Sequence, residues 1–325
     1  MPMPTLPTSA ELQELVRHPT AWRGPQLMLE PERWTVDWHD DLDRLAADIT
    51  HRLLHGLGFV LVRGAPVEAD PDGLGMALLD LSRRMGSLRS QNAGGDLLGH
   101  VRDVGLDVDD PNVRIYQTNE RQTFHTDSTD AVGLLCRSTA REGGASLLAS
   151  TVTALLEFDR RHPELTHWLF EPVATDRRGE VPDGMDPWFE IPVLSWFDGH
   201  LTGLYQRQYI DSAARFPAAP PLADEHRSAL DAFDAVVDDP DVHLSMELEP
   251  GDLQFVHNHS LLHDRTGFVD DPKAPRHLLR VWLSLPTDRE LPPVFAQRYG
   301  SIAVGDRGGI VTADPPRDIP EQIPT

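Results

Sequence analysis

Two distant motifs contain side chains that could bind a metal ion together. The motif FHTDS places His125 and Asp127 two residues apart, and the segment NHSLLHDR supplies His263. Two imidazoles and one carboxylate, held by separate parts of a β-rich fold, form the ligand set of non-haem Fe(II) oxygenases and leave one face of the metal open. These residues therefore predict an iron site that reacts with O₂.

The same spacing of a histidine and an acidic residue occurs twice more, so the spacing alone has little weight. His39 precedes Asp41 in an acidic run that is typical of a helix start, and His162 precedes Glu164 in a predicted turn. Charged residues in such places usually lie at the solvated surface. The pair in FHTDS, by contrast, lies in a region that is predicted to be rich in strands.

The segments around FHTDS suggest how His125 and Asp127 could share one ion. RIYQTN, FHTDS and AVGLLC are predicted to form a strand, a strand end and a buried strand. Side chains of residues i and i+2 of a strand point to the same face of the sheet. We therefore expect His125 and Asp127 to face the same ion.

The composition indicates a globular protein with an acidic surface. The chain has 325 residues, 40% of them hydrophobic, which is enough to bury a large core in one domain. Its 29 basic and 52 acidic residues give a net charge of −23, and no Lys/Arg-rich run is present that could neutralise phosphates. We therefore expect a small-molecule partner and no nucleic acid.

Cysteine content and the N-terminal sequence bear on the cellular compartment. Cys136 is the single cysteine, which excludes an intramolecular disulfide and a multi-cysteine zinc site. The first residues have neither a basic region nor a long apolar stretch, and the sequence contains no run of about 18 apolar residues. We therefore expect a cytoplasmic protein without a membrane partner, and leave a homo-oligomer open.

Periodicity divides the chain into a helical N-terminal part and a β-rich core. Helices are predicted from Ser9, over 41–57, over 73–86 and in the run LADEHRSALDAFDAVVDD. Apolar strands are predicted at FVLVRG, GGASLLAS, DLQFVHN and RHLLRVWLS. Many strands with few parallel crossovers favour a double-sheet jelly-roll, an α+β but mainly β fold that is flanked by helices.

One domain is expected over residues 1–312. Its helical part spans about 1–57 and its jelly-roll core about 58–312, with a middle insert at about 170–240. Residues 313–325 are rich in proline and charge, so we expect them to form a flexible tail.

The order and spacing of four segments resemble the Fe(II)/2-oxoglutarate-dependent dioxygenases of the taurine dioxygenase type, the TauD/TfdA-like family. These segments are FHTDS, GGAS, PGDLQFVHNHSLLHDRTGF and RHLLRVWLS, and they follow one another over most of the chain. The resemblance implies a double-stranded β-helix of the cupin-like jelly-roll type. It also implies that His125, Asp127 and His263 bind Fe(II), and that 2-oxoglutarate and O₂ are co-substrates.

Four histidines compete for the distal ligand position, namely His257, His259, His263 and His277. In the family that the segments resemble, the iron histidine lies five residues after an asparagine that follows a strand, and Asn258 with His263 reproduces this spacing. The resemblance then implies structural roles for His257 and His259, hydrogen-bonded to backbone or carboxylate groups.

Arg276 and Arg280 are the expected ligands of a dicarboxylate, because guanidinium groups bind carboxylates in bidentate geometry. They are four residues apart on a predicted strand and should therefore face the same side of the sheet. The resemblance implies that Arg276 binds the distal carboxylate of 2-oxoglutarate with help from Ser146, and that Arg280 lies near the iron-bound end. Ser146 stands where the family commonly has threonine.

The resemblance also implies the reaction. An unactivated C–H bond of a small organic molecule would be oxidised while 2-oxoglutarate and O₂ become succinate and CO₂. Hydroxylation is the expected outcome, and desaturation and cyclisation stay open. Halogenation is not expected, since the related halogenases lack the carboxylate that Asp127 provides.

Candidate substrate contacts lie on three segments. Tyr116, Gln117 and Asn119 belong to the strand expected at RIYQTN, and Gln91 lies on a loop that would cover the site. Arg207 belongs to the middle insert. If Arg207 faces the cavity, it favours a substrate that bears a carboxylate or a similar anion.

Two other functions are compatible with the same ligand residues. A cupin-like zinc or manganese hydrolase would act without O₂ and would need no arginine pair. A non-catalytic jelly-roll binding module would leave the three residues apart or engaged in hydrogen bonds. A serine or cysteine hydrolase is disfavoured, because the sequence has no GxSxG motif and Cys136 lies in an apolar run.

Overall fold

Two β-sheets that face each other form the centre of the molecule. The computed structural model describes residues 5–67, 71–107, 110, 113–310 and 316–318. Within these residues the larger sheet has the strand order β1-β2-β14-β6-β17-β3, with β4 also paired to β17, and the smaller sheet has the order β13-β8-β15-β5. All these pairs are antiparallel except β1 with β2. The arrangement confirms the expected jelly-roll.

The bounds of the strands follow the apolar segments of the sequence closely. The larger sheet contains β1 (Thr35–Asp37), β2 (Phe59–Arg63), β3 (Ser87–Arg89), β4 (Gly99–Val101), β6 (Ala131–Ser138), β14 (Leu253–His257) and β17 (His277–Ser284). The smaller sheet contains β5 (Gln122–His125), β8 (Ser146–Ser150), β13 (Leu244–Met246) and β15 (Leu261–Arg265). Short two-stranded pairs are formed by β7 (Glu142–Gly143) with β16 (Phe268–Val269), β9 (Pro172–Asp176) with β10 (Trp188–Pro192), β11 (Leu194–Phe197) with β12 (His200–Gly203), and β18 (Ile302–Ala303) with β19 (Asp306–Arg307).

Helices cover the sheets on the outside. They are α1 (Ser9–Leu15), α2 (Gly24–Leu27), α3 (Leu42–His55), α4 (Pro71–Met85), α5 (Thr151–Arg161), α6 (Arg207–Ser212), α7 (Asp224–Val237) and α8 (Ala296–Tyr299). Asp41 caps α3 by accepting the N–H of Arg44, which satisfies one of the free donors at the helix start. The apolar stripe of α3 is buried against α4 and the larger sheet.

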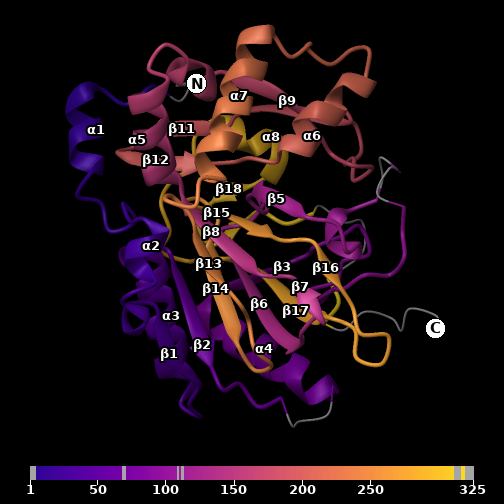
Figure 1. Ribbon diagram of the computed structural model, residues 1–325. Helices are drawn as coiled ribbons and strands as arrows, with labels where there is room; N and C mark the ends of the chain where they lie inside the picture. Colours follow the sequence, from indigo (N-terminus) through magenta and orange to yellow (C-terminus); the bar gives the residue numbers. More distant parts are fainter. Residues whose placement is uncertain (1–4, 68–70, 108–109, 111–112, 311–315, 319–325) are drawn as a thin grey trace.

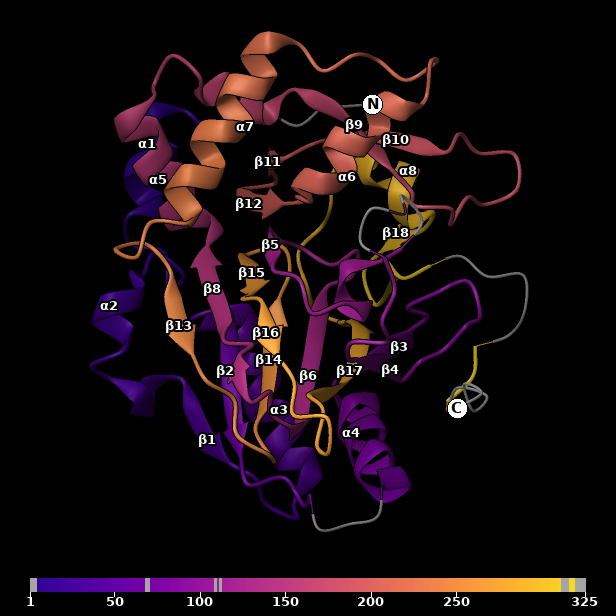
Figure 2. The same cartoon turned by 45° about the vertical axis from the view of Figure 1, so that its right-hand side comes forward.

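The middle of the chain forms a separate layer at one end of the sheets. Figures 1 and 2 both show α5, α6 and α7 together with β9, β11 and β12 above the strands, whereas α3 and α4 lie beside the opposite end. Apolar side chains of α5, α7 and β11 share one buried cluster with residues of β8 and β15. This layer therefore lies over the end of the smaller sheet at which β5 ends and β15 begins.

The strand expected at RIYQTN is absent from the described structure. Ile115–Gln117 instead forms a 3-10 turn, in which Gln117 and Thr118 donate their N–H groups to the carbonyls of Arg114 and Ile115, at 2.9 and 3.0 Å. These local bonds replace the pairing that a strand would need. The prediction was wrong because the residues are apolar enough for a strand but satisfy their backbone within the turn.

Two further predictions concern the C-terminal tail and membrane-spanning segments. The tail predicted over 313–325 lies outside the described residues, apart from 316–318. Among the helices that are described, we find no span with the length and apolar character needed to cross a membrane.

A buried charge network connects the C-terminal part to the turn between β14 and β15. Arg307 donates through Nε to Asp130 at 2.7 Å, and its Nη2 lies 3.1 Å from Asp288. His259 lies 2.9 Å from the same Asp130, and His257 lies 3.0 Å from Asp288. Since each of these side chains is almost completely buried, the opposite charges must compensate one another inside the protein.

We predict that Arg307→Met strongly destabilises the fold, because it removes the cation that Asp130 and Asp288 share and leaves Asp288, among the described guanidinium groups, with only the more distant Arg289, at 3.8 Å. The expected loss is about 3–5 kcal/mol in the free energy of unfolding. Urea denaturation at neutral pH measures it. The control is Arg33→Met, which removes an exposed ion pair with Glu30 and should cost less than about 1 kcal/mol. Equal losses in the two variants would contradict a stabilising role for the network.

Candidate functional site

His125, Asp127 and His263 lie together where the smaller sheet meets the larger one. One nitrogen or carboxylate oxygen from each of the three lies within 4.8 Å of the others. His125 and His263 are direct partners across β5 and β15, and their ring centroids are 4.1 Å apart. The antiparallel register therefore brings together two histidines that are far apart in sequence, and their donor atoms suit a divalent metal ion.

Asp127 reaches this cluster for a different reason than strand alternation. β5 ends at His125, and Asp127 lies beyond the strand end. The Asn258 side chain accepts the Asp127 N–H at 3.0 Å, and the Asp127 carbonyl accepts the N–H of Thr129 at 2.9 Å. The turn after the strand, anchored by Asn258, thus directs the carboxylate toward the two imidazoles.

The carboxylate of Asp127 is held in its charged form. Trp282 donates its indole N–H to Oδ2 at 2.8 Å, and the Arg280 guanidinium lies 3.8 Å from the same oxygen. Burial alone would raise the pKa of Asp127, but the positive charge of Arg280 above all, with the Trp282 hydrogen bond, helps to lower it below its ordinary value. A deprotonated carboxylate is the form that binds a metal ion.

The two histidines present neutral nitrogens to the same point. His125 Nδ1 lies 2.8 Å from the Thr123 carbonyl, which fixes the proton on that nitrogen and leaves Nε2 as an acceptor beside the Gln122 amide at 2.9 Å. Burial, with a smaller contribution from His125, lowers the pKa of His263 to about 3. Both rings are therefore neutral at physiological pH, as metal ligation requires.

A second set of potential ligands consists of Asp130, His259 and Asp288. Here the guanidinium of Arg307 already contacts both carboxylates, at 2.7 and 3.1 Å. A cation of the protein itself therefore compensates this cluster, which has a structural explanation without a metal. His257 belongs to the same network. His277 lies elsewhere, 2.8 Å from His100.

A cavity on one side of the cluster, here called the histidine cavity, brings together the residues expected to bind a dicarboxylate. It is lined by Val101, Tyr116, Gln122, His125, Asp127, Leu134, Ser146, Leu248, His263, Asp264, Arg265, Arg276, Leu278 and Arg280. Arg276 and Arg280 thus face the same side, as their spacing predicts. Arg265 also lines the cavity, although nothing in the sequence distinguished it.

Arg276 is buried in this cavity with an unused donor. Its Nη1 has no hydrogen-bond partner in the described part of the chain, and its guanidinium lies over the Phe268 ring, 5.2 Å from the centroid. Burial lowers its pKa to about 10, which still leaves the group charged at neutral pH. A side chain at Gly144 would come within 2.9 Å of Arg276 Nε, so the GGAS motif makes room for the arginine. Ser146 lies in the same cavity and donates to Gln254 at 3.0 Å.

Gln91 positions Arg280 and does not line the histidine cavity. Its side-chain amide donates to the carbonyls of Leu97 and Arg280, both at 2.8 Å, and its oxygen accepts from Arg280 Nε at 2.6 Å. The Arg280 guanidinium also lies over the Tyr116 ring, 4.5 Å from the centroid. The direct substrate contact expected for Gln91 is therefore replaced by an indirect role, because the side chain is buried behind the arginine.

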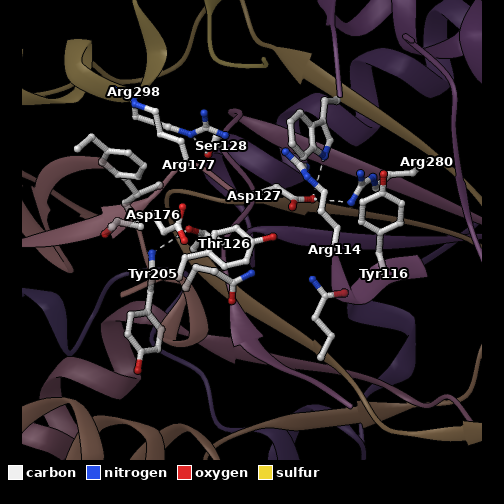
Figure 3. A pocket seen from close by; sticks show the side chains of 17 residues that line it. Arg114, Tyr116, Thr126, Asp127, Ser128, Asp176, Arg177, Tyr205, Arg280 and Arg298 are labelled. Carbon is white, nitrogen blue, oxygen red and sulfur yellow. Dashed lines mark hydrogen bonds and ion pairs between the residues drawn. The ribbon is translucent and has the colours of Figure 1, made fainter. Parts of the chain in front are cut away.

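A second cavity, here called the arginine cavity, opens on the other side of Asp127. It is lined by Arg114, Tyr116, Gln122, Thr126, Asp127, Ser128, Thr175, Asp176, Arg177, Phe189, Leu204, Tyr205, Gln206, Tyr209, Arg280, Trp282 and Arg298. Figure 3 shows Arg177, Arg298 and Ser128 on one side of this cavity, Arg280 and Tyr116 on the other, and Asp127 between them. The two cavities share Tyr116, Gln122, Asp127 and Arg280. Both therefore adjoin the carboxylate of the candidate metal centre.

Besides Gln91, three of the expected substrate residues are absent from both cavity linings. Gln117 and Asn119 are absent from both linings, whereas Arg114 and Tyr116 of the same segment line the arginine cavity. Arg207 is paired with three aspartates of α6 and α7, Asp211 at 2.9 Å, Asp231 at 2.6 Å and Asp234 at 2.8 Å. An anionic substrate contact was expected only if Arg207 faced the cavity, and the three ion pairs do not support that position.

Arginines that the sequence did not mark line the cavity instead. Arg114 is the first residue of RIYQTN and directly precedes the 3-10 turn, Arg177 directly follows β9, and Arg298 lies in the short helix α8. Nothing in their local sequence distinguishes them from surface arginines. Only the fold brings these three segments together.

A family model described as "Taurine catabolism dioxygenase TauD, TfdA family" matches residues 19–282. The FR-33289 synthase of Streptomyces rubellomurinus is 31% identical over 266 residues, which cover 79% of this chain and 78% of that protein. A uridine-5'-phosphate dioxygenase of a Streptomyces species is 30% identical over 259 residues, covering 73% and 89% of the two chains.

Solved structures show the same fold at lower identity. Asparagine oxygenase in complex with Fe(II), 3-hydroxyasparagine and succinate has a TM-score of 0.57 at 18% identity, covering 77% of this chain and 93% of that one. The non-heme iron oxygenase OrfP in complex with Fe and alpha-ketoglutaric acid has a TM-score of 0.54 at 18% identity, covering 87% and 94%. The likeness confirms the jelly-roll with flanking helices.

Cys136 lies in β6, away from both cavity linings. It is buried, and its thiol lies 4.0 Å from the Leu248 carbonyl. Burial raises the pKa of the thiol from its ordinary 9.0 to about 11. Since the thiolate is the reactive form, the native cysteine should be a poor nucleophile.

We predict that Cys136 of the native protein resists thiol reagents at pH 8. The higher pKa alone reduces the thiolate fraction about 100-fold, and burial adds a barrier to access. Titration with a chromogenic disulfide should therefore give less than one equivalent within minutes in buffer and one full equivalent in urea. Rapid reaction of the native protein would contradict the buried position of the thiol.

Proposed function

The chain belongs to the TauD/TfdA family of Fe(II)- and 2-oxoglutarate-dependent oxygenases, and we propose that His125, Asp127 and His263 bind its iron for the hydroxylation of a small anionic molecule. The main observation that supports this proposal is that two neutral imidazoles and one charged carboxylate converge within 4.8 Å, where the two cavities adjoin. This donor set suits Fe(II) and leaves coordination positions for other ligands. When bound, the iron supplies the activation of O₂ and the oxidation of the C–H bond.

The residues around the iron ligands would fix their orientation. Thr123 holds the tautomer of His125 through its carbonyl, and Trp282 holds one oxygen of Asp127. Such hydrogen bonds commonly set both the direction and the basicity of metal ligands. The protein's own contribution is thus to place three donors, keep them in the correct protonation state and exclude water from the buried cluster.

We propose that 2-oxoglutarate occupies the histidine cavity. Arg276 is charged, buried and has a free donor there, so it would bind the distal carboxylate, with Ser146 as a neighbouring hydroxyl. Arg280 lies between this position and Asp127 and would face the iron-bound end of the co-substrate. A dicarboxylate would compensate guanidinium charges that folding has buried in the cavity.

We propose that the primary substrate occupies the arginine cavity, on the other side of Asp127. Two relatives are named for their action on uridine-5'-phosphate, an anionic molecule, and the arginines of this cavity support an anionic substrate for this chain as well. Hydroxylation fits the presence of the carboxylate ligand Asp127. A cytoplasmic location, which suits a ferrous enzyme with one buried thiol, stays part of the proposal.

The two alternative functions, a metal-dependent hydrolase and a non-catalytic binding module, fit the site less well than an oxygenase. A zinc or manganese hydrolase would not require the buried arginines of the histidine cavity. A binding module would not require three converging metal donors. The family itself consists of oxygenases.

We predict that His263→Ala abolishes formation of the coloured iron complex of 2-oxoglutarate. Purified protein is mixed anaerobically with Fe(II) and 2-oxoglutarate, and the visible charge-transfer band of the chelated keto acid is recorded. Removal of one imidazole leaves two ligands and should remove the band. His39→Ala, which changes a half-buried histidine of the same sequence pattern, should retain it. A full band in His263→Ala, or none in wild-type protein that binds Fe(II), would contradict the assignment.

We predict that Arg276→Gln weakens the binding of 2-oxoglutarate about 10- to 100-fold, the usual effect of losing hydrogen bonds to a charged group. Titration of the same visible band with 2-oxoglutarate gives the dissociation constant. Arg137→Gln changes an exposed arginine of the neighbouring strand and should leave the constant unchanged. Equal affinity in wild type and Arg276→Gln would exclude Arg276 as the carboxylate ligand.

A further inference from the structure

Two arginines on the wall of the arginine cavity approach each other. Arg177 lies over the Phe189 ring with its guanidinium carbon 5.3 Å from the centroid, and Arg298 lies over the same ring at 5.7 Å. Arg177 follows β9 directly, and Arg298 belongs to α8. Figure 3 shows both side chains on the side of the cavity that faces Asp127. Two like charges from separate elements are therefore held against one aromatic ring.

Neither arginine of this pair has a carboxylate partner among the residues that the structure describes. Arg177 donates to the backbone carbonyls of Asp186 and Gln297, and its Nη1 is buried without a hydrogen-bond partner. Arg298 donates through Nε to the Ser128 hydroxyl at 2.9 Å, so its two terminal nitrogens are not used by this bond. The pair thus carries unused donors that face a cavity.

The other charges of the arginine cavity are already compensated. Arg114 forms an ion pair with Glu180. Asp176 is paired with Arg215, at 2.9 Å, and also accepts the Ser212 hydroxyl at 2.8 Å. The remaining carboxylate, Asp127, faces Arg280.

After these pairs are formed, Arg177 and Arg298 leave a surplus of two positive charges on one side of the cavity. Burial lowers the pKa of each to about 10, so both stay protonated at neutral pH. A buried charge without a counter-charge is costly, and two adjacent ones repel each other. An anion that binds between them removes both penalties.

We propose that Arg177 and Arg298 bind a phosphoryl dianion of the primary substrate, either a phosphate monoester or a phosphonate. A monocarboxylate would leave one of the two charges uncompensated, whereas a phosphoryl group carries about −1.5 to −2 charges and three acceptor oxygens. Planar guanidinium groups suit such oxygens through paired hydrogen bonds. The assignment rests on the proposed function, because it places the substrate in the cavity beside the iron ligands.

The position of the pair also orients the substrate. Arg177 and Arg298 lie on one side of the arginine cavity, and Asp127 lies between them and Arg280 (Figure 3). A substrate held by its phosphoryl group at the arginine pair would extend its carbon skeleton toward Asp127. The phosphoryl group itself would then stay away from the metal, and the oxidised carbon would belong to the opposite end of the molecule.

Four ligands of matched size test the proposal by titration calorimetry. They are ethyl phosphate, ethylphosphonate, ethanesulfonate and propionate, each titrated anaerobically into protein loaded with Fe(II) and 2-oxoglutarate. We expect wild-type protein to bind at least one of the two phosphoryl compounds about tenfold more tightly than the sulfonate or the carboxylate. Whichever of the two binds better identifies the ester or the phosphonate as the source.

Three variants locate the binding site. Arg298→Gln should weaken the preferred phosphoryl ligand about tenfold or more, and Arg298→Lys should weaken it less, because lysine keeps the charge but loses the planar pair of donors. Arg207→Gln is the control, since Arg207 lies nearby in sequence to the cavity residues but is paired with three aspartates. The visible 2-oxoglutarate band, unchanged in all three, shows that the variants are folded.

The outcomes separate this proposal from the proposed function. Equal or tighter binding of propionate, or equal affinity in wild type and Arg298→Gln, overturns the phosphoryl site. An equal loss of affinity in Arg207→Gln also overturns it, because the loss would then reflect the reduced positive charge of the protein as a whole and not a specific site. Phosphoryl binding that depends on Arg298 in protein without the iron band supports the anion site while contradicting the iron and 2-oxoglutarate assignments.

Discussion

The buried ion network around Arg307 holds together the two chain segments on which the candidate metal site depends. Arg307 binds Asp130, three residues after Asp127, and the same network includes His257 at the end of β14 and His259 in the turn that follows. Asn258 of that turn accepts the Asp127 N–H, and the turn continues into β15, which carries His263. Because the charges are buried, neither segment can move away without exposing an uncompensated ion. The spacing of the ligands is thus fixed by interactions that involve no ligand side chain.

Arg280 connects the metal cluster to both cavities. Gln91 and the rings of Tyr116 and Trp282 fix its guanidinium from three sides, and it lines the histidine cavity and the arginine cavity alike. Its separation of 3.8 Å from Asp127 is longer than a direct ion pair with a hydrogen bond. The arginine therefore keeps Asp127 charged while its own donors remain available to an anion in either cavity.

The sequence predicted the elements with strong periodicity and the residues in dense motifs, and it failed where tertiary contacts decide. FHTDS and NHSLLHDR were sufficient for His125, Asp127 and His263 to be chosen, yet Asp127 is directed by a turn bound to Asn258 and not by strand alternation. The segment around Tyr116 forms a 3-10 turn because its backbone bonds are local. A single arginine gives no such local signal, because only the assembled fold determines whether its charge is balanced by a carboxylate or left without one.

This difference explains how a strongly acidic protein could bind both 2-oxoglutarate and the anionic substrate that we propose. The net charge is −23, but exposed charges more than about 8 Å away are largely screened at physiological ionic strength. Arg177 and Arg276, by contrast, are buried with unused donors, each in its own cavity. Water does not screen them, so a bound anion interacts with them at a low effective dielectric constant. The acidic surface and the cationic cavities are therefore compatible, because burial and not net charge determines the electrostatics of the site.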